Sequence, residues 1–212
     1  MNRTFLLFSL VFFVGLILFL NGFLLTRRVI LQYSKGNIPN TVPNDFNQVI
    51  LVVIDALRYD FIKPSHSSNI NNYQNQMPFV QNLIETKSNQ SVLVKMLADP
   101  PTTTLQRLKA LTTGTLPTFI DLSYNFVGYE IEEDNILKQL KIGPNARNIS
   151  LLGDDTWLAL YPNLGFQHLH VYPSFDVHDL DTVDNGILTH LWTVLNSNQQ
   201  RSSFIIAHFL GE

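Results

Sequence analysis

The chain has 212 residues, of which 45% are hydrophobic and 15% are charged, a composition typical of a folded domain rather than a disordered segment. Cysteine is absent, which excludes disulfides, cysteine-ligated zinc and thiol nucleophiles. Any bound metal must therefore use oxygen or imidazole ligands. After residue 28, acidic residues outnumber basic ones, and a negatively charged body argues against nucleic acid as a partner.

The chain begins with an apolar segment, Phe5–Leu25, that has no charged residue. At 1.5 Å per residue, a helix of this length spans about 30 Å, the thickness of the hydrocarbon layer of a bilayer. A cleaved signal peptide is the alternative, but its apolar stretch is shorter and ends in small residues, whereas this one runs into Arg27 and Arg28. We therefore expect a single-pass, uncleaved membrane anchor.

The orientation of this anchor is left open by two opposing signals. Arg27, Arg28 and Lys35 follow the helix, and the positive-inside rule then places the body in the cytosol. Asn89 and Asn148 each begin an Asn-x-Ser sequence, a glycosylation site that has meaning only in a lumen.

The sequence divides into three parts: an anchor with its flanks (1–28), a linker rich in turn-forming residues (29–46) and a domain (47–212). Val49–Ile54 is a continuous apolar run ending at Asp55, the pattern of a strand buried on both faces. Residues 65–76 are rich in Ser, Asn and Gln and indicate a surface loop. The other expected strands are 91–97, 148–152, 168–172 and 203–208, and the expected helices are 78–85, 102–113 with Gly114 as its C-cap, 133–140, 156–160 and 182–195.

This alternation predicts an α/β domain with a mainly parallel sheet and helices on both faces. In such sheets ligands bind at the carboxyl ends of the strands, where Asp55 and the Gly153-Asp154-Asp155 group both fall. From its position alone, Asp55 is either a metal ligand or the N-cap of a helix.

Pro100-Pro101-Thr102-Thr103-Thr104 leads directly into the expected helix at 102–113. A threonine hydroxyl there would meet the free N–H groups and the positive dipole end that favour a phosphate, although these threonines can also simply cap the helix. A threonine is a poor nucleophile unless a base or a metal lowers its pKa. No histidine is near Thr104 in the sequence, so a metal held partly by Asp55 is the simplest activator, and two divalent ions would stabilise both the attacking and the leaving oxygen.

Several longer motifs accompany these residues: 52–60, 98–109, 111–114, 116–121, 125–126, 153–157, 173–175, 179–186 and 208–211. Through them the chain resembles the GPI ethanolamine phosphate transferases of the alkaline phosphatase superfamily. Its motifs are most similar to those of the type 3 branch. The resemblance covers residues 47–211 and implies an alkaline-phosphatase-like fold.

The resemblance implies a role for individual residues. Asp55 corresponds to the first metal-binding aspartate, Thr104 to the nucleophile that also contacts the metal, and Asn125 to an asparagine that contacts the phosphoryl oxygens. Asp154 or Asp155 could contact the ethanolamine cation, or could only complement a helix dipole. The implied cofactor is zinc, with two ions in the complete enzyme.

The implied substrates are phosphatidylethanolamine, which donates phosphoethanolamine to Thr104, and a GPI precursor lipid, whose mannose hydroxyl then accepts it. The resemblance also implies the endoplasmic reticulum membrane with the body in the lumen, and a small stabilising membrane subunit. In a lumen the acceptor sequences at Asn89 and Asn148 would be glycosylated. In the family, Asp-His segments follow the His-Phe-Leu-Gly block, and they are absent here. We therefore expect an inactive fragment of the enzyme, and the alternative is a non-catalytic, membrane-tethered binding module or isoform.

Other polar clusters have a simpler interpretation. His168 and His170 would face the same way on a strand and could bind a metal, but their apolar surroundings favour a half-buried structural pair. The acidic cluster of Asp179, Asp181 and Asp184 is interpreted as a solvated helix start. The remaining histidines, His66, His178, His190 and His208, show no ligand spacing.

Overall fold

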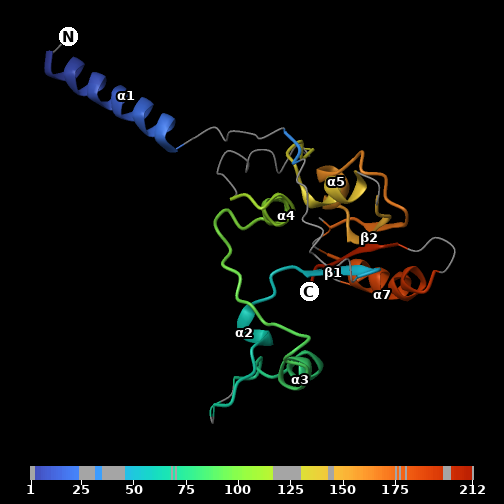
Figure 1. The fold of residues 1–212 in the computed structure, drawn as a ribbon. Helices are drawn as coiled ribbons and strands as arrows, with labels where there is room; N and C mark the ends of the chain where they lie inside the picture. The colour runs from blue at the N-terminus through green and yellow to red at the C-terminus, as the bar shows by residue number, and fades with distance from the viewer. Residues whose placement is uncertain are drawn as a thin grey trace. The chain divides into compact units, whose positions relative to one another are not determined.

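The computed structural model describes residues 3–23, 32–34, 46–67, 69, 71–116, 130–142, 146–174, 176, 178–179, 181–197 and 202–211 (Figure 1). The chain forms two compact units, and each is described by itself. Unit 1 comprises residues 1–43, 99–146 and 156–164. Unit 2 comprises residues 44–98, 147–155 and 165–212.

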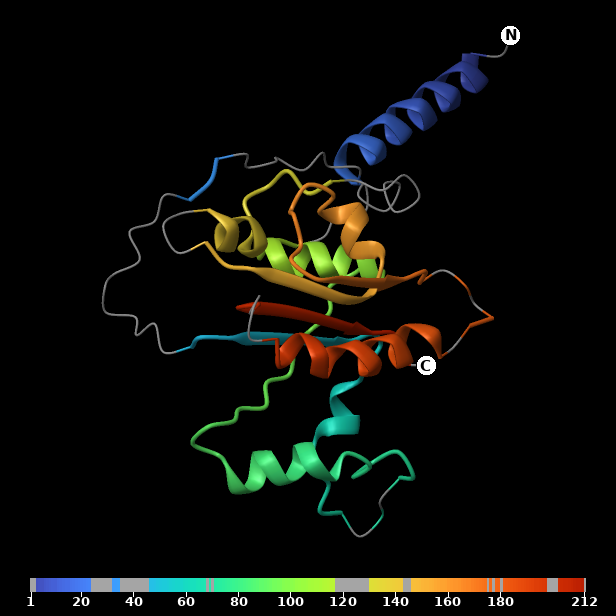
Figure 2. The ribbon, with the colours of Figure 1, turned by 90° about the vertical axis from the view of Figure 1, so that its right-hand side faces the viewer.

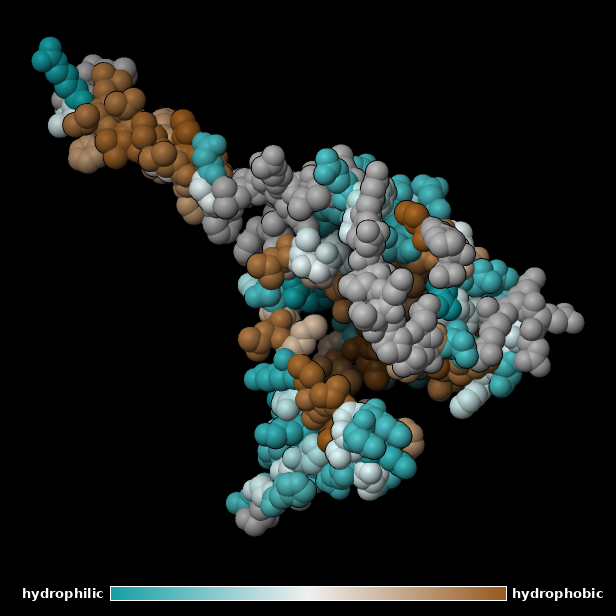
Figure 3. Space-filling view, viewed as in Figure 1, coloured by the Kyte–Doolittle hydropathy of each residue, from teal (hydrophilic) through white to brown (hydrophobic). Residues whose placement is uncertain are grey.

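The amino-terminal segment forms one long helix, α1 (Arg3–Phe23). Its surface is almost entirely apolar, and nearly all of its large hydrophobic side chains are exposed (Figure 3). By length and composition this helix is able to cross a membrane. The predicted helix is confirmed to within two residues at each end, while most of the expected linker, including residues 36–44, lies outside the described residues.

Unit 2 is built on a four-stranded sheet with the order β1-β4-β2-β3, and every pairing in it is parallel. Its strands are β1 (Val49–Ile54), β2 (Ile149–Asp154), β3 (Leu169–Tyr172) and β4 (Phe204–Phe209). The last strand of the sequence therefore lies between the first two, hydrogen-bonded to both. This arrangement confirms the predicted α/β fold with a parallel sheet.

One helix, α7 (Thr182–Leu195), covers one face of this sheet (Figure 2). Ile187 of α7 packs in a buried apolar cluster with Leu152 of β2 and with Ile205 and Ala207 of β4. The helix approaches the sheet closely, because a Cβ atom at Gly186 would lie 2.3 Å from the ring of Tyr172. The packing of α7 thus depends on a residue without a side chain at that turn.

Two strand expectations are wrong. β1 is an edge strand, and Val49, Ile50 and Val52 are 43%, 44% and 51% exposed rather than buried on both faces. An apolar run of this kind is equally suited to an edge and to a central position, so its pattern did not separate β1 from the fully buried β2. Residues 91–97 are not a strand at all, since they pair with no other strand among the described residues and their alternate valines are exposed.

The remaining helices of unit 2 are short. α3 (Pro78–Thr86) matches the expected helix and begins with a proline at its first turn, where a missing N–H costs nothing. α2 (Tyr59–Ile62) is a single turn, too short to show a periodic apolar pattern in the sequence. Its N-cap is Arg58, whose guanidinium pairs with Asp60 at 2.6 Å and lies over the Phe61 ring.

The described part of unit 1 also contains α4 (Thr104–Thr113), α5 (Ile136–Lys141) and α6 (Thr156–Leu160), and α4 packs against both of the others. The positive φ of 68° at Gly114 ends α4 as a left-handed C-cap, as predicted. α5 begins three residues later than expected because Asn135 caps it, accepting a hydrogen bond from the backbone N–H of Lys138. The fully buried side chains of this unit include Ile131, Leu137, Trp157 and Leu160.

We predict that Gly153→Ala strongly destabilises unit 2. Gly153 has a φ of 110°, and an added Cβ would lie 2.1 Å from the backbone oxygen of His208 and 2.8 Å from Ile187 Cδ1. Overpacking and the positive φ together should lower the free energy of unfolding by about 2–4 kcal/mol, measured by denaturant titration.

The matched control is Gly114→Ala, because Gly114 has a positive φ of 68° but no atom within 4 Å of the added Cβ. Only the backbone strain of about 1–2 kcal/mol should appear there. Equal losses at the two glycines would show that the close approach of β2 to β4 is not what requires Gly153.

Candidate functional site

The carboxyl ends of β1, β2 and β4 bring several charged side chains to one edge of the sheet in unit 2. Asp55 directly follows β1, and its backbone N–H donates to the carbonyl of Phe209 at the end of β4, 3.0 Å away. His208 of β4 is in register with Val53 on one side and with Gly153 on the other. The strand register therefore places His208 between Asp55 and Asp154.

Asp154 and His208 form a buried pair. Asp154 Oδ2 lies 3.3 Å from Nδ1 of His208, and both side chains are excluded from solvent. Burial lowers the pKa of His208, while the negative charges of Asp154, Asp55 and Asp184 act in the opposite direction. His208 shows no ligand spacing in the sequence, and only the register of the parallel sheet reveals its neighbours.

The backbone after β1 holds the Asp55 carboxylate in a tight turn. Its Oδ1 accepts a hydrogen bond from the N–H of Ala56 at 2.8 Å, and Ala56 has a positive φ of 53°, which is uncommon for a residue with a side chain. The next helix is capped by Arg58 and not by Asp55. The N-cap alternative for Asp55 is thus not met, and its role as a metal ligand stays a prediction.

Asp184 has a different role from the solvated one expected for the acidic cluster. It lies in the first turn of α7, and its carboxylate oxygens accept hydrogen bonds from the backbone of Leu210 at 2.8 Å and Gly211 at 3.3 Å. Asp184 therefore holds the segment that follows β4. Asp179 does mark the helix start, because it accepts from Thr182 N at 3.0 Å, and hydrogen bonds from Thr182 lower its pKa.

Asp154 and Asp155 contact protein groups in this structure. Asp154 meets His208, and Asp155 Oδ1 accepts from the hydroxyl of Ser174 at 2.8 Å and from its backbone N–H at 3.2 Å. Asp155 thereby holds the end of β3 beside the end of β2. A contact of Asp154 with a substrate cation stays a prediction.

Thr104 is the first residue of α4 in unit 1, and Thr103 is the N-cap. The Thr103 side chain makes no capping hydrogen bond, although the alternative in which these threonines only cap the helix requires one. Thr104 is half-buried at the helix end, where backbone N–H groups and the dipole favour an anion. Asn125 lies outside the described residues, and Asp55 belongs to the other unit, so the shared cation also stays a prediction.

A buried ion pair lies on the same helix as Thr104. Lys109 Nζ is 3.1 Å from Glu133 Oε1, and both side chains are about 5% exposed. Nearby, the hydroxyl of Tyr161 donates to Thr112 Oγ1 at 2.6 Å, and burial is the main reason why the pKa of Tyr161 is raised. These contacts fix α4 from its buried side. Sequence reasoning missed them, because a single lysine in a helix and a distant glutamate carry no signal of pairing.

The described residues do not by themselves make up a zinc centre. No group of three or more His, Asp or Glu side chains among them is placed to hold one ion. Asp55 and Thr104 offer oxygen donors, but zinc in proteins takes about three or four protein ligands.

His170 stacks on His190 with ring centroids 4.0 Å apart and an interplanar angle of 8°. In stacked rings the nitrogen lone pairs lie in parallel planes and do not converge on one ion, which favours the structural interpretation. Burial, followed by repulsion from His190 and His168, lowers the pKa of His170.

The two glycosylation sequences differ in their surroundings. Asn89 lies in an exposed turn. Asn148 is exposed just before β2, but the serine of its sequence, Ser150, is fully buried, with its hydroxyl 2.5 Å from that of Ser202. In the folded unit, Asn89 therefore has the more accessible acceptor sequence.

Comparison with curated proteins gives relatives over nearly the whole chain. The chain is 42% identical over 222 residues to GPI ethanolamine phosphate transferase 3, catalytic subunit, of Homo sapiens. The aligned region covers 94% of this chain and 20% of that protein. It is also 42% identical over 219 residues to GPI ethanolamine phosphate transferase 3 of Saccharomyces cerevisiae, covering 99% of this chain and 21% of that protein. GPI ethanolamine phosphate transferase 2, catalytic subunit, of Homo sapiens is 36% identical over 178 residues, or 84% of this chain and 17% of that protein.

These identities confirm the resemblance to the GPI ethanolamine phosphate transferases, and these type 3 relatives match at higher identity than this type 2 relative. The chain spans about a fifth of the length of the curated relatives it matches. No protein-family model matches the chain, and no solved structure matches it significantly.

We predict that Lys109→Met destabilises unit 1 by about 3–5 kcal/mol, because it removes the ammonium that lies 3.1 Å from the buried carboxylate of Glu133. The double variant Lys109→Met with Glu133→Leu should recover most of this loss, since it removes the buried charge as well. Denaturant unfolding of the single and double variants measures both effects. A double variant that is no more stable than Lys109→Met would contradict the pairing.

Proposed function

We propose that this homologue of the GPI ethanolamine phosphate transferases is part of an enzyme of GPI anchor biosynthesis. The enzyme would transfer phosphoethanolamine from phosphatidylethanolamine to a mannose of a GPI precursor lipid. The observation that carries the proposal is the identity of about 40% to the type 3 transferases over 94–99% of the chain. The placement of Thr104 at the start of α4 and of Asp55 at the end of β1 supports it.

The proposed reaction has two displacements at phosphorus. In the first, Thr104 Oγ1 attacks the phosphorus, the bond to the diacylglycerol oxygen breaks, and that oxygen takes up a proton. In the second, a mannose hydroxyl attacks the phosphothreonine, the Thr104–phosphorus bond breaks, and the hydroxyl's proton returns to Thr104. The first N–H groups of α4 point out of its start, where they can bind the phosphoryl oxygens as negative charge develops.

Asp55 would be one carboxylate ligand of a zinc site. Zinc, when bound, lowers the pKa of a coordinated oxygen and polarises a phosphoryl group. The turn formed by Asp55 and Ala56 holds the carboxylate at the carboxyl end of β1, with Oδ1 accepting from the Ala56 N–H. The two zinc ions of this proposal need further ligands in addition to Asp55 and Thr104, and Asn125 would add a contact to the phosphoryl oxygens.

Both proposed substrates are lipids, and a membrane-anchoring role for α1 would bring the site to them. Confinement to the same membrane raises the effective concentration of lipid substrates at the site. We propose the endoplasmic reticulum membrane as the location, with the body in the lumen and a small membrane subunit as a stabilising partner. The apolar surface of α1 and the exposed Asn89 support an anchored, luminal protein.

We predict that Thr104→Val abolishes phosphoethanolamine transfer when it is tested in a full-length transferase that contains residues 1–212. The change removes the attacking oxygen but keeps the shape of the side chain, so α4 should still form. Thr104→Ser keeps a hydroxyl and should retain measurable activity, whereas Thr103→Val removes only the neighbouring hydroxyl. Transfer is measured as labelled phosphoethanolamine in the GPI precursor and in the trapped enzyme intermediate.

Full activity of Thr104→Val, with normal amounts of folded protein, would refute the nucleophile. Loss of activity in Thr103→Val but not in Thr104→Val would move the role by one residue. A membrane-tethered, non-catalytic module is the second candidate function, favoured by the lack of a three-ligand metal group among the described residues. It becomes the better interpretation if the unsubstituted, folded protein gives no transfer.

We predict that Asn89 is glycosylated, because it lies in an exposed turn and the body faces the lumen in this proposal. Asn89→Gln should remove one glycan, seen as a faster-migrating band on a gel after expression in cells. Gln90→Asn is the control, since it leaves the Asn89-x-Ser91 sequence intact. Membrane-associated protein that carries no glycan at either sequence would place the body in the cytosol.

A further inference from the structure

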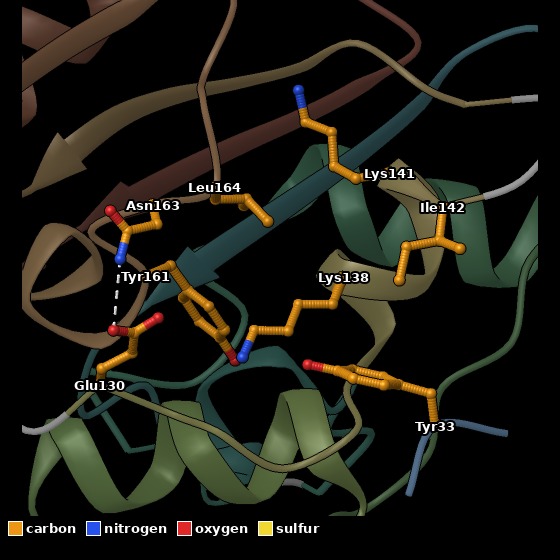
Figure 4. Close-up of a pocket in the computed structure, with 8 residues that line it drawn as sticks. All are labelled: Tyr33, Glu130, Lys138, Lys141, Ile142, Tyr161, Asn163 and Leu164. Atoms are coloured by element: carbon orange, nitrogen blue, oxygen red, sulfur yellow. Dashed lines mark hydrogen bonds between the residues drawn. The ribbon is translucent and has the colours of Figure 1, made fainter. Parts of the chain in front are cut away.

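Unit 1 contains a pocket of about 250 Å³ that none of the proposed catalytic residues lines (Figure 4). Its walls come from α5, from the segment around Tyr161 and from the segment that follows α1. The residues that line it are Tyr33, Glu130, Lys138, Lys141, Ile142, Tyr161, Asn163 and Leu164.

The pocket is separate from the start of α4. The hydroxyl of Tyr161 is bonded to Thr112, eight residues after Thr104. At 1.5 Å per residue these positions are about 12 Å apart along the helix. The pocket therefore lies near the carboxyl end of α4, whereas the proposed nucleophile is at its amino end.

One wall of the pocket is held in place by a clasp on the segment that leaves α1. The backbone N–H of Ser34 donates to Asp134 Oδ2 at 2.8 Å, and the amide of Gln139 donates to Asp134 Oδ1 at 2.6 Å. Burial raises the pKa of Asp134, but the hydrogen bonds from Ser34, Gln139 and Asn135 outweigh burial and leave the pKa lowered. Tyr33 is thus fixed beside α5 by its neighbour in the chain.

This clasp keeps the pocket close to the membrane if α1 is a span. Tyr33 is the tenth residue after Phe23, the end of α1. An extended chain of ten residues covers at most about 36 Å. Molecules at the bilayer surface, such as lipid headgroups, are therefore within reach of the pocket.

The hydrogen-bond donors of the pocket and its carboxylate lie in different parts of it. The Lys138 ammonium and the hydroxyls of Tyr33 and Tyr161 point toward one another (Figure 4). Lys138 donates one of its three N–H groups to the carbonyl of Ile131 at 2.6 Å, which fixes the ammonium in position. The carboxylate of Glu130 accepts from the amide of Asn163 at 3.3 Å and offers further acceptor sites.

From this arrangement we propose that the pocket binds the headgroup of a membrane phospholipid, namely a phosphodiester that also carries hydrogen-bond donors. Lys138 and Tyr33 bind the phosphate, because an ammonium and a phenol donate to an oxyanion. Glu130 accepts from an amine or hydroxyl at the other end of the headgroup. The rings of Tyr33 and Tyr161 and the side chains of Ile142 and Leu164 form the apolar walls.

The proposal relies on the membrane anchoring proposed above only for the source of the ligand, so the test uses soluble headgroups. The full chain, kept in detergent micelles free of phospholipid, is titrated with four probes by calorimetry. These are glycerophosphoethanolamine, glycerophosphoinositol, glycerophosphocholine and inorganic phosphate. The first two should bind saturably. The last two should bind at least about tenfold more weakly, because the choline end of glycerophosphocholine has no N–H or O–H donor for Glu130 and inorganic phosphate has no second end.

Tyr33→Phe and Glu130→Gln should each weaken binding of glycerophosphoethanolamine about tenfold, as expected for a lost charge-assisted hydrogen bond. Neither residue is fully buried, so both variants should fold normally, which a thermal melt checks. The matched controls are Tyr73→Phe and Lys95→Gln, two exposed residues of unit 2, and they should leave binding unchanged.

Three outcomes would overturn the proposal: no saturable binding of any probe, inorganic phosphate binding as tightly as the diesters, or binding that is unchanged in both pocket variants. Tight binding of free phosphate would identify a simple anion site in place of a lipid site. These results do not depend on transfer activity. Failure of the headgroup site therefore leaves the transferase proposal standing, and failure of that proposal leaves this one standing.

Discussion

The insertion of β4 between β1 and β2 is the constraint on which unit 2 depends. β4 pairs with β1 over six residues and with β2 over five, so two strands far apart in the sequence share one central neighbour. Without β4, the carboxyl ends of β1 and β2 would not be held at the same edge of one sheet. Asp55 would then have no fixed position relative to Asp154. The same insertion buries His208 beside Asp154 and places the segment after β4 where Asp184 can hold it.

The close packing around β4 explains why small and charged residues occur in its neighbourhood. Gly153 and Gly186 let a neighbouring strand and α7 approach to distances that no Cβ would allow. Asp154 and Asp184 occupy positions where a buried histidine ring and two backbone N–H groups need acceptors. Polar residues at this edge therefore serve the fold as well as any chemistry, and the Gly153–Asp155 motif cannot be assigned to substrate binding from its sequence alone.

The sequence predicted the elements with strong periodicity well and their positions in the sheet poorly. The helices 156–160 and 182–195 match the structure residue for residue, because apolar spacing and flanking turn residues mark both ends. The edge position of β1, the absence of a strand at 91–97 and the pairs Lys109–Glu133 and Asp154–His208 depend on contacts between distant segments. Local patterns do not encode such contacts, so only the carboxyl-end location of Asp55 and the helix-end location of Thr104 were predictable parts of the site.

Polar side chains lie at two different places along α4 in unit 1. At the start of α4, Thr104 lies at the positive end of the helix dipole. Farther along, Lys109 and Thr112 tie the helix to Glu133 and Tyr161, so the helix axis is fixed from its buried side. The nucleophile role proposed for Thr104 requires a helix start that does not move, since a small misplacement costs a large part of the rate. The buried ion pair, which does little for stability compared with an apolar pair, is thus best understood as a device that sets the position of α4.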